Sequence, residues 1–137
     1  MVKSKRLEQL HTALEAKYLA RRAATANLLQ REGVLRQDIE KLNNQDREVD
    51  ANAGDAMHAV GADLIWEAWV GRSKAKLNIQ LAQVLAQKEM AQRGVAKEFA
   101  KMHAVESLLQ KNRRLARKQA AEKALAAAVE HDLRRKR

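Results

Sequence analysis

The sequence predicts an all-α fold, an antiparallel two-helix coiled-coil hairpin with a long overhanging C-terminal helix. The first observation is a ladder of aliphatic residues separated by seven or a multiple of seven, which only Arg21 breaks: Leu7, Leu14, Leu28, Leu35, Leu42 and Val49. Such a repeat keeps one stripe of a helix against a partner helix. In addition, proline is absent and strong helix formers dominate the composition. Only the short segment from Gly54 to Gly61 interrupts the helical pattern.

The two expected helices differ in length. We expect the first over residues 3–52, with Ser4 as its N-cap, and the second over residues 63–133. The turn, residues 53–62, contains Gly54 and Gly61 and has room for one short helical turn. At about 1.5 Å per residue the helices span roughly 75 Å and 100 Å, so the second must overhang the first. We treat residues 1–137 as a single coiled-coil domain.

Charge is distributed unevenly along the chain. The net charge is +10, from 27 basic and 17 acidic residues. Residues 101–137 carry eleven Lys or Arg against four Asp or Glu, whereas residues 41–63 carry two against five. A strongly basic end attracts an acidic partner, which can be nucleic acid, anionic lipid or an acidic protein rim.

Several classes of protein are disfavoured by what the sequence lacks. It has no cysteine for disulfide or thiol chemistry, and charges interrupt every apolar run before about 18 residues. No histidine pair has the spacing of a zinc-protease helix, and Gly71 to Lys74 lacks the second glycine of a phosphate-binding loop. His58, with Asp55 and Asp63 nearby, is the one place where a metal could be proposed, although a solvated turn histidine is the simpler interpretation. We therefore expect no enzyme, catalytic residue, metal or cofactor.

Two further features each allow two interpretations. Trp66 and Trp69 are three residues apart and so lie on one helix face. They either attach the second helix to the first or form an anchor for a partner, and different ring faces can do both. The basic runs Lys111–Lys118 and Arg134–Arg137 are either a solvated helix end or a docking surface.

Three segments carry a resemblance to a known family. They are Leu64-Ile65-Trp66-Glu67-Ala68-Trp69, Glu98-Phe99-Ala100-Lys101 and Leu115-Ala116-Arg117-Lys118-Gln119. With the basic N-terminus and the heptad leucines, they resemble the FliJ family of flagellar export proteins and its injectisome relatives of the YscO or SctO type. The resemblance covers nearly the whole chain. The first helix has few aromatic residues near the turn, where flagellar members often carry them, so the choice between the two systems stays open.

The resemblance implies a function in a type III secretion system. Family members are antiparallel coiled coils similar to the shaft of a rotary ATPase. They bind the hexameric secretion ATPase, reach toward the export-gate membrane protein and handle export chaperones, in the cytoplasm at the inner-membrane export apparatus. The implied ATPase-binding residues are Lys3, Lys5, Arg6, Arg21, Arg22, Arg113, Arg114 and Arg117. The implied gate-binding residues are Leu42, Trp66 and Trp69.

Two alternatives from other classes remain. The chain could be a basic coiled coil that binds nucleic acid or anionic surfaces without sequence preference, although base-reading motifs are absent. It could also be a self-assembling structural scaffold. No small-molecule substrate is expected under any of these interpretations.

Overall fold

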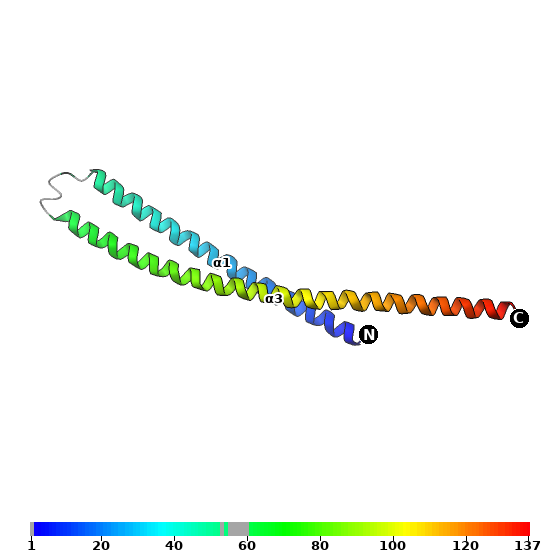
Figure 1. Ribbon diagram of the computed structural model, residues 1–137. Coiled ribbons are helices and arrows are strands. Elements are labelled where there is room, and N and C mark those ends of the chain that lie inside the picture. The colour runs from blue at the N-terminus through cyan, green and yellow to red at the C-terminus, as the bar shows by residue number, and fades with distance from the viewer. Residues whose placement is uncertain (1, 53, 55–60) are drawn as a thin grey trace. The chain divides into compact units, whose positions relative to one another are not determined.

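The chain is built from two long helices in a computed structural model that describes residues 2–52, 54 and 61–137 (Figure 1). Helix α1 is Val2–Asn52 and helix α3 is Ala62–Arg135, and the described residues form no strand. The all-α class and both expected helices are confirmed, with their ends shifted by no more than two residues. Ser4 lies inside the first turn of α1 and does not cap it. The short helical turn that we expected between the helices lies outside the described residues.

Helix α3 begins at a glycine turn. Gly61 has a φ of 74°, a left-handed conformation that glycine adopts without strain. Its carbonyl oxygen accepts the first bond of the helix, from the Ile65 amide nitrogen at 3.4 Å. Asp63 lies in the first turn of α3, where a carboxylate interacts favourably with the helix dipole.

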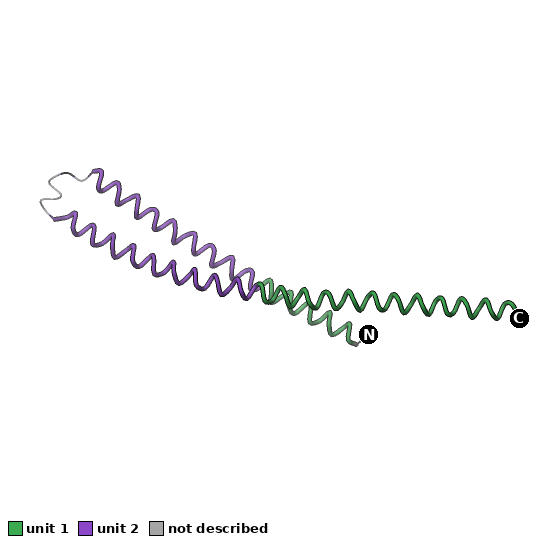
Figure 2. The backbone as a smooth tube through the Cα atoms, viewed as in Figure 1, with its two compact units in different colours: residues 1–19, 96–137 green, residues 20–95 purple. Residues whose placement is uncertain are grey.

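Both helices contribute to each of two compact units (Figure 2). Unit 1 contains residues 1–19 and 96–137, and unit 2 contains residues 20–95. In unit 2 the helices are antiparallel, because Glu32 pairs with Lys88 while the later residue Asp46 pairs with the earlier residue Trp66. In unit 1 Lys17 pairs with Glu98.

A regular seam of buried and half-buried residues joins the helices within each unit. In α1 these residues recur at steps of three and four: Ser4, Leu7, His11, Leu14 and Tyr18 in unit 1, then Thr25, Leu28, Glu32, Leu35, Ile39, Leu42, Asp46 and Val49 in unit 2. Every aliphatic residue of the predicted ladder lies on this seam. The α3 side follows the same rule with one additional four-residue step, from Leu77 to Leu81, which directly follows the four-residue step from Ser73 to Leu77.

The seam of α3 does not contain every large apolar residue of that helix. Leu64 and Phe99 are exposed, and the helix buries Val70 and Glu98 instead. Val84 is the most deeply buried aliphatic residue, at 1% exposure. From Arg113 to the C-terminus every residue is exposed.

Candidate interaction surfaces

The two tryptophans have different environments in unit 2. Trp66 is half-buried, and its indole nitrogen donates a hydrogen bond to Oδ1 of Asp46 at 3.1 Å. Lys74 Nζ lies 3.9 Å from the other oxygen of the same carboxylate. The Trp69 ring packs at a tilt against the Trp66 ring, with centroids 5.2 Å apart, yet Trp69 is 45% exposed. Trp66 therefore attaches α3 to α1, whereas Trp69 leaves part of its ring exposed to solvent.

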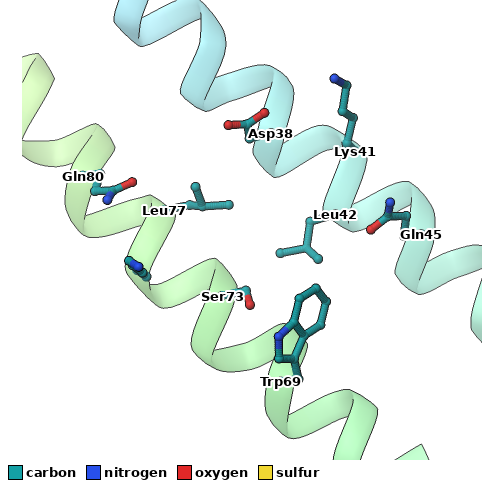
Figure 3. A pocket seen from close by; sticks show the side chains of 9 residues that line it. Asp38, Lys41, Leu42, Gln45, Trp69, Ser73, Leu77 and Gln80 are labelled. Atoms are coloured by element: carbon teal, nitrogen blue, oxygen red, sulfur yellow. The ribbon is translucent and has the colours of Figure 1, made fainter.

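Trp69 forms a groove with Leu42, the third residue of the implied gate-binding set. Leu42 is only 5% exposed, and it points from α1 toward the Trp69 ring (Figure 3). The groove is about 390 Å³ and open to solvent, which suits a partner's side chains better than an enclosed small molecule. Its lining comes from both helices: Asp38, Lys41, Leu42 and Gln45 of α1, and Trp69, Ser73, Lys76, Leu77 and Gln80 of α3.

An ion-pair layer crosses the seam of unit 2 at Glu32. Lys88 Nζ donates to Glu32 Oε2 at 2.9 Å, and Arg36 donates to Oε1 through Nη2 at 3.1 Å and Nε at 3.2 Å. The pKa of Glu32 lies below its usual value of 4.5, chiefly because of the hydrogen bond from Lys88. Burial opposes this shift, and Arg36 adds to it. The carboxylate therefore remains charged although it is buried.

A second layer lies in unit 1 around Glu98, which is 2% exposed. Lys17 Nζ approaches Glu98 Oε1 at 3.4 Å, and Lys101 Nζ approaches the same atom at 3.9 Å. Next to it the Tyr18 and Phe99 rings meet across the seam, with centroids 5.7 Å apart. These contacts join the start of α1 to α3.

The implied ATPase-binding residues are all exposed, and they fall in both units. Six of them belong to unit 1: Lys3, Lys5, Arg6, Arg113, Arg114 and Arg117. A shallow pocket there is lined by Glu8, His11 and Thr12 of α1 and reaches Arg113 of α3. The antiparallel pairing therefore places the basic start of α1 near the arginine cluster of α3.

Arg21 and Arg22 belong to unit 2. The Arg21 guanidinium lies over Gly94, where an added Cβ would be 2.6 Å from Nη1. The glycine thus leaves room for the arginine head group. The structure does not place these two arginines in the cluster of unit 1.

Other classes of site find no support in the described part of the chain. It contains no group of three or more His, Asp or Glu side chains arranged to hold a metal ion. His58 and Asp55, of the turn metal site considered above, lie outside the described residues. Neither described helix contains a stretch that is long and apolar enough to cross a membrane.

Sequence reasoning did not find the partners of the two carboxylates on the seam, which are Lys88 for Glu32 and Trp66 for Asp46. Asp46 and Glu32 belong to the series Ser4, His11, Tyr18, Thr25, Glu32, Ile39 and Asp46, whose members are seven residues apart. That spacing is the signal that could have placed both carboxylates on the seam.

No family model matches the chain, and no curated protein or solved structure matches it either.

Proposed function

We propose that this protein is a central stalk or adaptor of a type III secretion apparatus, which binds the hexameric secretion ATPase and links it to the export gate. It acts on the ATPase without hydrolysing anything itself, in the cytoplasm at the inner-membrane export apparatus. In this proposal the fold is an antiparallel coiled-coil hairpin, and the C-terminal part of α3 overhangs the start of α1.

The observation that carries the proposal is the exposed end of α3. Residues 113–137 hold nine Lys or Arg against three Asp or Glu, and every one of these residues is exposed. The same segment exposes four large aliphatic side chains: Leu115, Leu125, Val129 and Leu133. A helix that presents both charge and unpaired apolar residues is suited to insertion into a partner, which would bury the apolar residues.

The charge of this segment fits an acidic opening. Oppositely charged surfaces accelerate encounter and orient the partners, and salt weakens this effect because the Debye length is about 8 Å at physiological ionic strength. Arg113, Arg114 and Arg117 would make the first contacts, supported by Lys3, Lys5 and Arg6 in the same unit. Arg21 and Arg22 would make separate contacts from unit 2.

The seam supports a role as a rigid element. Steps of three and four residues are the spacing of a coiled coil, and the additional four-residue step at Leu77 to Leu81 is a local irregularity that such helices accommodate by unwinding. The Leu42 and Trp69 groove would contact the gate, with Trp66 holding the Trp69 ring in place.

The test is ATP hydrolysis by the secretion ATPase of the same cell, with and without this protein, together with co-elution on a sizing column. We expect co-elution and faster hydrolysis, and we expect the triple variant Arg113→Glu, Arg114→Glu, Arg117→Glu to lose the stimulation while keeping its helical circular dichroism. The matched control reverses three exposed arginines of unit 2, Arg31, Arg47 and Arg72, and should stimulate normally. Unchanged stimulation by the first triple variant would refute the role of the cluster.

The same exposed charge favours one alternative, non-specific binding of nucleic acid. In that case DNA affinity would fall steeply with salt and the same triple variant would abolish it. Absence of ATPase binding together with a salt-sensitive gel shift would move the assignment to this class. A dimer or larger species by light scattering, without either activity, would indicate a scaffold.

A further inference from the structure

A second groove continues the one at Trp69 along the same side of unit 2. It is about 520 Å³ and is lined by Gln30, Arg31, Val34 and Leu35 of α1 and by Gln80 and Gln83 of α3. Gln80 also lines the first groove, so the two adjoin. We call the combined surface the α1/α3 groove.

The α1/α3 groove has the length and periodicity of a helix-binding site. Its α1 lining runs from Gln30 to Gln45 at helical spacing, which at about 1.5 Å per residue is roughly 22 Å, or four turns. Apolar side chains follow its floor and walls, with Val34 at 51% exposure and Trp69 at 45%. A third helix of about 15 residues would cover this surface and form a three-helix arrangement.

The charges on the lining select the kind of helix. The lining contains three cations, Arg31, Lys41 and Lys76, but only one carboxylate, that of Asp38, and its remaining polar side chains are neutral. A second copy of this chain, with a net charge of +10, would bring more positive charge to the same rim. A helix that carries several carboxylates would complement the positive charge of the rim.

A groove on the opposite side of unit 2 has a different lining. It contains the asparagines Asn43, Asn44 and Asn78, the charged residues Arg36, Glu40 and Arg47, and two half-buried apolar residues, Ile39 and Leu81. It contains no aromatic side chain. Binding should therefore be confined to the Trp69 side.

We infer that the α1/α3 groove binds an acidic amphipathic helix of about four turns from a partner protein, with its apolar stripe on Leu42, Leu77 and Trp69 and its carboxylates toward Lys41 and Lys76. This inference adds detail to the proposed gate-binding role. It rests on the proposed function only for the identity of the protein that supplies the helix. The binding mode itself follows from the side chains of unit 2.

The test uses two helix-stabilised peptides of about four turns, with leucine on one face and either glutamate or lysine flanking it. Titration into the full chain is followed by anisotropy of a labelled peptide and by selectively excited tryptophan fluorescence, which reports on Trp66 and Trp69. We expect one acidic peptide per chain, a blue shift of the tryptophan emission, and binding at least tenfold weaker for the basic peptide.

Charge variants locate the binding. The double variant Lys41→Glu, Lys76→Glu should bind the acidic peptide about tenfold more weakly and prefer the basic one. Each substitution removes an attraction to the carboxylates of the acidic peptide and adds a repulsion in its place. The matched control Arg47→Glu changes a lining residue of the asparagine groove and should bind as the original chain does. Trp69→Ala should also lose affinity, and circular dichroism checks its fold.

Several results would overturn the inference: equal affinity for both peptides, no binding of either, or an equal loss in Arg47→Glu. A chain that dimerises by light scattering and resists the peptide would show that a second copy covers the groove. The titration contains no ATPase, so a failure of the stalk proposal would leave its result unchanged, and the converse also holds.

Discussion

Replacement of Val84 with alanine tests whether the seam of unit 2 stabilises the fold. Val84 is 1% exposed, and the variant removes two buried methyl groups. At about 0.8 kcal/mol for each, the lost transfer free energy is about 1.6 kcal/mol, and the cavity left behind raises the expected loss of unfolding free energy to about 2 kcal/mol. For a chain of this size the melting temperature should fall by about 6–10 °C.

The assay is thermal unfolding of the isolated protein followed by circular dichroism at 222 nm, with Leu125→Ala as the control. Leu125 is 67% exposed, so its truncation should change the unfolding free energy by less than about 0.5 kcal/mol. An equal loss from both substitutions would refute the reasoning, since it would mean that the end of α3 is packed in solution. With the ATPase present, Leu125→Ala should instead weaken the complex.

Three further outcomes are expected from the polar contacts. The lowered pKa of Glu32 makes its charged form stabilising above the unfolded value of 4.5, so stability is lost as pH falls through the folded pKa; Glu32→Gln should flatten the curve of melting temperature against pH in that range. Trp66→Phe removes the donor to Asp46 and should lower the unfolding free energy by about 1–2 kcal/mol, measured by urea titration, and no change would mean that water replaces the indole. Gly94→Ala should raise stability by up to about 1 kcal/mol, because only the flexible end of Arg21 must move; a loss measured in the same titration would show that the arginine is held in place.

The helices could be predicted well because the residues within each segment are enough to favour a helix. Without proline, and with one glycine-containing break, nothing in either segment ends a helix early, so the expected ends were correct within two residues. The leucine ladder likewise identified the α1 side of the seam, and Leu42 is buried on it. Each of these predictions needs only the spacing within one helix.

Pairing across the seam could not be predicted in the same way. The seven-residue series places Glu32 on the seam, but which lysine it meets depends on the alignment of α3, and no local pattern fixes that alignment. The buried track of α3 runs through Val70 and Glu98, and it leaves Leu64 and Phe99 exposed. The different roles of Trp66 and Trp69 have the same origin, because the seam runs through Trp66 and Val70 and leaves Trp69 at its edge.

The ion-pair layer at Glu32 has a mechanical consequence. If α3 were displaced along α1 by one heptad, the carboxylate would face Leu81 or Val95 instead of Lys88, and the Trp66 indole would leave Asp46 at the same time. In a purely aliphatic seam every heptad would offer an equivalent packing position. A force along the helix axes could then slide α3 past α1 without the loss of a specific contact. The two polar contacts therefore oppose sliding of α3 along α1 in unit 2, as the proposed stalk role would require.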